Sequence, residues 1–461
     1  MKSLSKICDA ADWFDTEFHS IILNELKEPP RFHRKQWEFA MIFLALKKLG
    51  FLNENMKGLS LGGGNERVLY SIAQHVKELI VTDLYNENTT WDCAKTTDPN
   101  QYIEASKPFE VDLSKIKALA MDMRYLDFED NTFDFCYSSC AIEHIGDFDD
   151  FVKHLDEVYR VLKEDGVYVF TTELNFGSDT VKDQNNYIFT SSFLNEIFNS
   201  IKLTPDNNVD VNLVNHEINT PLPSNVKNLC FNKEESFTKS IMESYQHLIL
   251  LRGKYPFTSV QFVMRKKSDI STKKELIFNG LSDTENYLQT RLQIYTELLQ
   301  NSVVSFNPFS SLPQGVSPYF LDHSNFFSDR RTDNNADTLF HTDYFWLGNG
   351  KRLFNVKFDV ADVEDVSSNN IIQLRIHSYS TLSSKDVECV FEKDLDINII
   401  RNIEEFITLD ISEEYCFAIL GKMKSGNCTI KNLQLESWNM KNNKIYYMRK
   451  HIVQQTESVL Q

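Results

Sequence analysis

One short segment, residues 58–66 with the sequence GLSLGGGNE, constrains the fold more than any other part of the chain. Its first residues predict a short apolar strand, and the three glycines that follow predict a tight turn. The apolar spacing over residues 68–76 then predicts a helix, and residues 79–82 (LIVT) predict a second strand that ends at Asp83. Together these elements form a β-α-β unit, in which glycines let the backbone approach a ligand closely.

The residues of this unit narrow the class of ligand. Asp83 follows the glycines by about 20 residues, the position from which an acid holds a ribose diol. The third glycine of the G-x-G-x-x-G pattern is missing, and Glu66 stands near the start of the helix instead. A carboxylate there would repel the pyrophosphate of a dinucleotide. The pattern therefore favours a nucleoside ligand with a cationic centre, such as S-adenosylmethionine (SAM), over the distant alternative of a nicotinamide dehydrogenase.

Further strands and helices continue the same alternation. Strands are predicted over residues 118–121, 133–139 and 167–172, and a helix over 148–162 leads to a turn at 163–166. Alternating strands and helices predict an α/β domain with a Rossmann-like, doubly wound parallel sheet. Ligands of such a sheet bind at the carboxyl ends of its strands. The polar residues that we expect at these ends are Asp83, Asp122, Ser138, Ser139, Thr172 and Glu173.

The rest of the chain divides into segments of different character. Residues 1–56 are predicted to be helical, and the polar segment 86–112 interrupts the regular pattern. Residues 209–214 and 259–265 predict an antiparallel edge pair, separated by a helical insertion over 234–251. We therefore predict a Rossmann-like domain with N-terminal helices over 1–267, a helical connector over 268–305, a β-sandwich over 306–440, and a final helix or tail over 441–461.

Composition limits the partners and the compartment. The formal net charge of −18 disfavours nucleic acid as the main partner. No apolar run approaches the ~20 residues that a membrane helix needs, and the first residues do not resemble a signal peptide. The eight cysteines form no C-x-x-C pair, so we expect neither a disulfide framework nor a zinc site. A cytoplasmic location fits these observations best.

The chain up to about residue 267 resembles class I SAM-dependent methyltransferases. It is most similar to a branch associated with bacterial glycan synthesis, whose nucleotide loop reads G-x-G-x-E. Ser60 departs from the wider superfamily, in which an acid is common at this position. The segments that carry the resemblance are RKQWE at 34–38, LGGGNE at 61–66, TDL at 82–84, SSCAIEHIG at 138–146 and TTELN at 171–175.

The resemblance implies a set of cofactor-binding residues. Gly62 and Gly64 would let the backbone approach the methionine and ribose portions of SAM, and Asp83 would bind the ribose hydroxyls. Asp122 would contact the adenine amino group, with Met123 against the ring. Ser138 and Ser139 would line the floor below the methyl group. The full set of cofactor-binding residues that the resemblance implies is Gly62, Gly63, Gly64, Glu66, Asp83, Leu84, Asp122, Met123, Ser138 and Ser139.

Catalytic residues are predicted from chemistry and position. Transfer to an oxygen nucleophile usually needs a general base, and His144 is the leading candidate because imidazole titrates near neutrality. Glu143 and Glu173 are alternates, as the base or as partners that orient His144. A histidine at this position can equally cap the next helix, and the carboxylates can be structural. A divalent ion at these three residues is a further alternative, but no supporting shell of ligands is visible, so we predict no metal.

These patterns predict an enzyme that methylates a hydroxyl of a sugar or glycan intermediate with SAM as cofactor. The alternative is a catalytically idle methyltransferase fold that serves as a scaffold beside glycosyltransferases. Aromatic residues at 341–346 (HTDYFW) and Trp438 could stack on sugars, although a strand that buries its rings in the core explains them equally. The acceptor, the oligomeric state and the role of the β-sandwich are not determined by the sequence.

Overall fold

The computed structural model describes most of the chain. The described residues are 3–89, 91–183, 186–206, 208–223, 226, 229–231, 246–267, 276–306, 330–331, 338–363, 369–426 and 428–441. They divide into two compact units. The first comprises residues 1–221, 246–250 and 255–289, and the second comprises 222–245, 251–254 and 290–461. Among the described helices, none has both the length and the apolar character that crossing a bilayer requires.

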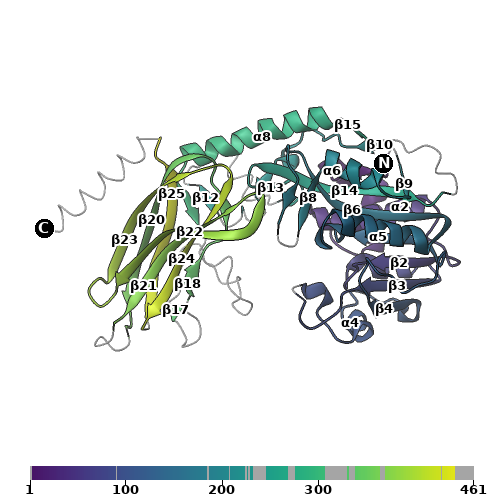
Figure 1. Ribbon diagram of the computed structural model, residues 1–461, viewed down its shortest axis with the longest axis horizontal. Coiled ribbons are helices and arrows are strands. Elements are labelled where there is room, and N and C mark those ends of the chain that lie inside the picture. Colours follow the sequence, from purple (N-terminus) through teal and green to yellow (C-terminus); the bar gives the residue numbers. More distant parts are fainter. Residues whose placement is uncertain are drawn as a thin grey trace. The chain divides into compact units, whose positions relative to one another are not determined.

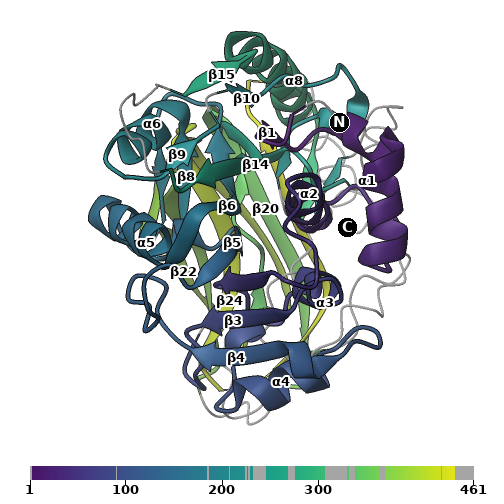
Figure 2. The ribbon, with the colours of Figure 1, turned by 90° about the vertical axis from the view of Figure 1, so that its right-hand side faces the viewer.

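A mixed β-sheet forms the centre of the first unit, with helices on both faces. Its order is β15-β10-β1-β14-β6-β5-β2-β3-β4, and β6, β5, β2, β3 and β4 are mutually parallel. Figure 2 shows α5 and α6 on one side of this sheet and α1 and α2 on the other. The main strands are β1 (Lys6–Ile7), β2 (Lys57–Leu61), β3 (Glu78–Asp83), β4 (Ile116–Ala120), β5 (Phe133–Ser139), β6 (Leu162–Asn175), β10 (Asn208–Asp210), β14 (Tyr255–Arg265) and β15 (Ile277–Asn279).

Helices and short strands complete the first unit (Figure 1). The helices are α1 (Thr16–Ser20), α2 (Arg34–Lys48), α3 (Arg67–Ala73), α4 (Pro99–Ala105), α5 (Phe148–Val161) and α6 (Ser191–Asn199). The single helical turns are η1 (Ala10–Phe14), η2 (Ile21–Glu25), η3 (Asp92–Ala94), η4 (Leu113–Lys115), η5 (Ile142–His144) and η6 (Glu217–Asn219). The short strands are β7 (Val181–Lys182), β8 (Tyr187–Thr190) and β9 (Thr204–Pro205).

Local sequence explains why the helices begin where they do. The His33 side chain accepts a hydrogen bond from the Lys35 amide at the start of α2, and Asp147 with Asp150 forms a capping box on α5. Helix α2 is buried on nearly every side from Gln36 to Leu46 because it packs against the sheet. This burial agrees with the apolar residues that the sequence places on more than one face of α2.

Three predictions about the first unit are wrong in detail. Residues 6–7 lie in β1, not in a helix, because their backbones pair with β10 and β14. Strands β10 and β14 do not form an antiparallel edge pair, since β1 lies between them and β14 pairs with β6. The predicted turn at 163–166 belongs to β6, where Asp165 has a φ of +62° and the pairing with β5 shifts register. Most of the predicted helical insertion at 234–251 lies outside the described residues, but residues 250–252 form strand β13 (Leu250–Arg252).

The second unit contains two antiparallel sheets. One has the order β12-β16-β25-β20-β23 with β17 on β25, and the other has the order β18-β24-β21-β22 with β19 on β24. The long strands run in nearly the same direction in Figure 1, and apolar residues of both sheets share one core. Its strands are β12 (Leu229–Phe231), β16 (Val304–Phe306), β17 (Arg330–Arg331), β18 (Thr338–His341), β19 (Phe345–Trp346), β20 (Gly350–Ala361), β21 (Ile371–Ser380), β22 (Ser383–Asp396), β23 (Asn402–Ile411), β24 (Tyr415–Ser425) and β25 (Thr429–Asn439).

The predicted β-rich composition of this region is thus confirmed, whereas its assignment to a β-sandwich stays a prediction. Phe345, Trp346 and Trp438 are at most 5% exposed, so these rings serve the core instead of forming a stacking surface. Helix α8 (Leu281–Asn301) lies within the predicted helical connector at 268–305, but residues 277–279 of that range form strand β15, which pairs with β10. The predicted tail at 441–461 lies outside the described residues beyond Lys441.

Candidate active site

Predicted cofactor residues gather at the carboxyl edge of the parallel strands. The glycine loop follows β2, Asp83 ends β3, and Ser139 ends β5. The register of the sheet places these ends next to one another, since β2 pairs with both β3 and β5. Thr172 and Glu173 lie inside β6, which continues to Asn175, so the prediction that they end a strand is wrong by three residues.

Two neighbours restrict the glycine loop. Gly62 and Gly64 have φ values of +63° and +45°, in the left-handed region that favours glycine. A Cβ atom on Gly62 would lie 2.6 Å from the Ala141 Cβ, and one on Gly63 would lie 2.2 Å from the Ser60 Oγ. Packing inside the protein therefore requires both of these glycines. The close approach of Ser60 to Gly63 also explains why residue 60 is small, because a larger side chain there would collide with the backbone of Gly63.

Asp83 ties the end of β3 to the glycine loop. Its Oδ2 accepts a hydrogen bond from the Gly64 amide at 2.8 Å, and its Oδ1 accepts one from the Leu84 amide at 2.7 Å. Burial raises the pKa of Asp83, and these two amides oppose that effect. Each carboxylate oxygen retains a second lone pair for a ligand hydroxyl. The Leu84 side chain itself is 53% exposed.

Asp122 and Met123 follow β4. Both oxygens of Asp122 accept hydrogen bonds from the Arg124 guanidinium, with the shortest at 2.7 Å. Burial raises the pKa of Asp122, but the hydrogen bonds and the charge of Arg124 outweigh burial and keep this pKa below its usual value. An adenine amino group would thus share Asp122 with Arg124. Met123 is buried, with its Cε 3.4 Å from the position of a Cβ on Gly62.

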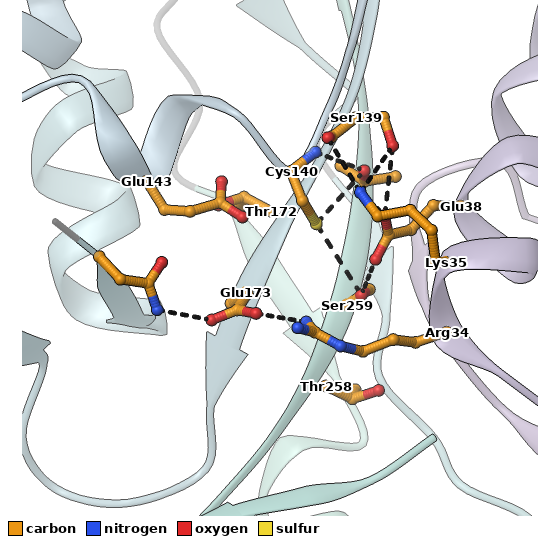
Figure 3. A network of polar contacts seen from close by, with 12 residues as sticks. Arg34, Lys35, Glu38, Ser139, Cys140, Glu143, Thr172, Glu173, Thr258 and Ser259 are labelled. Atoms are coloured by element: carbon orange, nitrogen blue, oxygen red, sulfur yellow. Dashed lines mark hydrogen bonds and ion pairs between the residues drawn. The ribbon is translucent and has the colours of Figure 1, made fainter. Parts of the chain in front are cut away.

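A partly buried ion cluster connects α2 with β5 and β14 (Figure 3), and it extends to Glu66 of the glycine loop. The Lys35 Nζ lies 2.9 Å from the Glu38 Oε2 and 3.3 Å from the Glu66 Oε1, and it donates to the Ser139 Oγ at 3.3 Å. Ser139 in turn donates to Glu38, and so does Ser259 from β14. Ser138 precedes Ser139, and side chains alternate between the faces of a strand, so the two predicted serines do not lie together.

The two carboxylates of this cluster differ in protonation. Burial alone would raise the pKa of Glu38, but Lys35 and Arg34 outweigh it and lower the value to about 2. Burial raises the pKa of Glu66 to about 7, against the attraction of Lys35. The Glu66 Oε2 is buried and has no hydrogen-bond partner among the residues that the structure describes. Glu66 is therefore able to bind a cation or a donor group of a ligand.

A second cluster surrounds β6 (Figure 3). Arg34 forms an ion pair with Glu173, and the other Glu173 oxygen accepts a hydrogen bond from the Asn186 amide at 3.1 Å. Glu143 accepts a hydrogen bond from the Thr172 hydroxyl at 2.9 Å, whereas its Oε1 has no partner within the described part of the chain. Glu143 is 1% exposed, and burial together with Glu173 raises its pKa to about 8. Glu143 can therefore hold or accept a proton near neutral pH.

Backbone strain marks the turn between β5 and Glu143. Cys140 has a φ of +49°, a left-handed conformation that costs a non-glycine residue about 1–2 kcal/mol. Its amide donates to the Thr171 carbonyl at 3.1 Å, so the strained turn is held by β6. Burial raises the pKa of the Cys140 thiol well above its usual value, which agrees with a packing role for this cysteine.

The histidines near the site lie in different surroundings. His144 packs its ring against Trp91, with centroids 4.5 Å apart and planes at 46°. His247 stacks on His33 at 4.3 Å beside the start of α2. Burial lowers the pKa of His33 to about 4 and that of His247 to about 3.

The structure adds residues that the sequence reasoning did not assign to the site. Arg34, Lys35 and Glu38 belong to a segment that carries the family resemblance, and Ser259 comes from β14. The sequence feature that could have identified them is the presence of three charged residues at the start of a helix that is otherwise apolar on several faces. No group of three or more His, Cys, Asp or Glu side chains suited to a metal is found among the described residues.

The residues present fit S-adenosylmethionine. The open oxygen of Glu66 suits the ammonium group of the methionine portion, and the Asp83 carboxylate suits the ribose hydroxyls. Met123 offers an apolar face beside the glycine loop for the adenine ring. These residues come from three adjacent strand ends, as the cofactor of such a sheet requires.

Comparisons with known proteins agree with this interpretation. Residues 59–170 match the family model described as "Methyltransferase domain". No curated protein matches the chain. Similar solved structures include a putative sarcosine dimethylglycine methyltransferase from Galdieria sulphuraria (13% identity, 50% of this chain and 85% of that chain, TM-score 0.30). A putative methyltransferase from Bacillus halodurans is similar over 49% of this chain and 98% of its own (14% identity, TM-score 0.31).

A third similar structure is geranyl diphosphate C-methyltransferase from Streptomyces coelicolor in complex with S-adenosyl-L-homocysteine (SAH) (11% identity, 49% of this chain and 77% of that chain, TM-score 0.30). The assignment itself rests on the family model and on the site described above. Residues 59–170 are similar to a methyltransferase domain, whose cofactor is S-adenosylmethionine.

Proposed function

We propose that this protein transfers a methyl group from SAM to a hydroxyl of a sugar or glycan intermediate. The observation that carries the proposal is Glu143, a buried carboxyl group with one oxygen that no described residue engages. When bound, SAM supplies a methyl group on a sulfonium, which an oxygen nucleophile displaces in line. A hydroxyl is a weak nucleophile, so a base that removes its proton as the bond forms accelerates the transfer.

We assign the base to Glu143. Its pKa of about 8 places it close to working pH, the condition under which a general base is effective. Thr172 fixes one oxygen of the carboxyl group and leaves the other free to accept the proton of the acceptor. Glu173 is less suited to act as the base, because Arg34 and Asn186 engage both oxygens of the Glu173 carboxylate. Glu173 instead raises the proton affinity of Glu143 through the repulsion of two carboxylates.

His144 is the second candidate for the base. It adjoins Glu143 in η5, and its ring rests on Trp91. An acceptor that approaches from the side of Trp91 would meet His144 before Glu143. The two candidates are separable by substitution, because only the residue that takes the proton should carry the pH dependence of turnover.

A polyhydroxy acceptor is supported by the chemistry of the two ion clusters. Lys35 and Arg34 provide donors, and the carboxylates beside them provide acceptors, within a few residues of the strand ends. Sugars are held by such alternating donors and acceptors because every hydroxyl both donates and accepts. The link to glycan synthesis, to neighbouring glycosyltransferases and to the cytoplasm rests on the resemblance of the loop and of the segment SSCAIEHIG.

The experiment combines cofactor binding with turnover. Calorimetry with SAM and SAH should show binding to the wild type, and absence of binding would refute the enzyme assignment. Incubation with SAM and a panel of sugar nucleotides and glycan extracts should then yield SAH and a product heavier by one methyl group.

Variants of one carboxyl group identify the base. Glu143→Gln should lower turnover by about 10²–10⁴-fold while SAM affinity stays within a few-fold. The matched control is Glu78→Gln, which removes a surface carboxylate at the opposite end of the sheet, where Glu78 pairs with Lys57. Unchanged turnover in Glu143→Gln together with a loss in His144→Ala would transfer the role to His144. Methylation of amines or carbon atoms alone would refute the O-methyltransferase assignment.

A further inference from the structure

Arg124 connects the residues that we assign to the adenine ring with the candidate catalytic turn η5. Its Nε and Nη2 donate to the Asp122 carboxylate, with the shortest contact at 2.7 Å. Its Nη1 donates to the Ile145 carbonyl at 3.0 Å and to the Asp150 Oδ1 at 2.9 Å. We call Asp122, Arg124, the Ile145 carbonyl and Asp150 the adenine brace.

The far end of the adenine brace is attached to the end of the turn. Ile145 follows His144 directly, and its amide closes η5. Asp150 contacts Arg124 with one oxygen, and its Oδ2 accepts a hydrogen bond from the Asp147 amide at 3.2 Å. Gly146 has a φ of +140°, and a Cβ atom there would collide with the Asp150 carboxylate. The backbone after His144 therefore packs closely against the brace.

The adenine brace joins two segments that both border the glycine loop. In the sheet, β2 and β3 lie between β4, which precedes Asp122, and β5, which precedes η5. Nevertheless, both segments reach Gly62, because a Cβ atom on Gly62 would lie 3.4 Å from the Met123 Cε and 2.6 Å from the Ala141 Cβ. The brace thus links two parts of the chain that border the expected cofactor site.

The strength of the adenine brace depends on how much water reaches it. The side chains of Arg124 and Asp122 are 29% and 27% exposed, and ion pairs at this exposure contribute little because water screens them. An adenine ring on Asp122 would displace that water, and the attraction between the two charges would grow as the local dielectric falls. The cofactor would therefore strengthen the hold of Arg124 on the turn.

We propose that Arg124 is a positioning residue that transmits occupancy of the adenine site to the turn η5, which carries Glu143 and His144. It acts through Asp122 at one end and through the Ile145 carbonyl at the other. The proposal rests on the proposed function, because it takes the adenine ring of SAM to lie at Asp122 and the base to lie in η5. It adds a coupling between the cofactor and the group that accepts the proton.

Hydrogen exchange of the turn, with and without saturating SAH, measures this coupling and needs no methyl acceptor. The amides of His144 and Ile145 donate within η5, and the Asp147 amide donates to Asp150, so all three report opening of the turn. In the wild type, SAH should slow their exchange by about five- to tenfold, the lower end of the usual range for coupled sites. The low end is expected because the brace is partly exposed.

Arg124→Gln should lose most of this slowing, so that SAH changes the exchange of the turn by less than about twofold. The variant should fold, because the buried His154 ring still contacts the Met123 carbonyl at 3.1 Å and holds the same loop on α5. Its affinity for SAH should stay within about fivefold of the wild type, because a partly exposed ion pair contributes little to a neighbouring contact. Calorimetry measures that affinity.

Arg160→Gln is the matched control. The Arg160 side chain is 30% exposed and also joins a carboxylate, Glu157, to a backbone carbonyl, that of Leu126 at 2.7 Å. It lies outside the adenine brace, so the variant should keep the SAH-dependent slowing of the turn. Loss of stability alone would affect the two arginine variants alike. Asp150→Asn keeps an oxygen for the Asp147 amide but loses the charge beside Arg124, so it should lose part of the slowing.

Three results would overturn the adenine brace. One is SAH that binds to the wild type without slowing exchange of the turn. Another is equal slowing in the wild type, Arg124→Gln and Asp150→Asn, and the third is an equal loss in Arg124→Gln and Arg160→Gln. Failure of the wild type to bind SAH would instead refute the proposed function. In that case the ligand-free proteins judge the brace, because the turn should exchange faster in Arg124→Gln than in Arg160→Gln, and equal rates would refute it.

Discussion

Glu38 offers the sharpest test of what holds α2 on the sheet. Its carboxylate is 0% exposed and accepts hydrogen bonds from Lys35, Ser139 and Ser259. Glu38→Gln keeps the shape of the side chain but removes the charge that compensates Lys35. We expect the variant to fold, with α2 less firmly attached to β5 and β14.

The magnitude follows from the protonation of Glu38. Its pKa is about 2 in the folded chain against a usual 4.5, and this difference corresponds to about 3 kcal/mol of stability at neutral pH. The folded pKa is the lower one, so the contribution is fully present above about pH 5 and is lost as the pH falls towards 2. At about pH 3.5, roughly 2 kcal/mol should remain.

Hydrogen exchange of the α2 amides measures this contribution locally, without requiring that the whole chain unfold in one step. The difference in opening free energy between wild type and Glu38→Gln should be about 3 kcal/mol at pH 7 and should shrink at pH 3.5. Glu17→Gln is the matched control, because Glu17 pairs with Lys47 and Lys48 of the same helix at the surface. That variant should change exchange by less than about 1 kcal/mol. Equal exchange in wild type and Glu38→Gln, or a difference independent of pH, would refute the reasoning.

Two further predictions concern the chemistry of the site. Because the pKa of Glu143 is raised to about 8 and the base is the deprotonated form, turnover should rise with pH through about 8 and then level off. A pH–rate profile checks this, and a wild-type profile that falls over that range would contradict the role of Glu143. Asp83→Asn should weaken SAH binding by about ten- to hundredfold, because an amide cannot accept from the Gly64 and Leu84 amides and from the ribose together. Calorimetry measures the loss, and unchanged affinity would remove Asp83 from the ribose site.

Local patterns predict the centre of the first unit well. Residues 79–82 and 133–139 lie in the parallel part of the sheet and are buried except for Asp134, so their sequences are mainly apolar, aromatic or small and identify strands without knowledge of their partners. The helix over 148–162 carries a regular apolar stripe and a capping box, and its observed bounds differ by one residue. The glycine loop is similarly local, because its turn depends on neighbouring residues.

The ion clusters could not be derived from local patterns. Arg34, Lys35 and Glu38 occupy the first turns of a helix, where charges usually face solvent. Their partners lie at Ser139, Glu173 and Ser259, more than a hundred positions away, and the pairing of β6 with both β5 and β14 brings them together. Glu143 and His144 are neighbours in sequence, but Glu143 accepts a hydrogen bond from Thr172 and His144 packs on Trp91.

The place of β1 has a consequence for how the chain is made. Lys6 and Ile7 pair with β10 and β14, and the Gln261 amide reaches the Leu4 carbonyl across 257 positions of sequence. On the ribosome, these residues emerge long before β14 and wait until it has been synthesised before their strand can form. Contacts between such distant residues form slowly, because a long loop must close first. Strand β1 is thus among the last elements of its unit to find its place, and any factor that shields a nascent chain would meet residues 4–7 exposed during that interval.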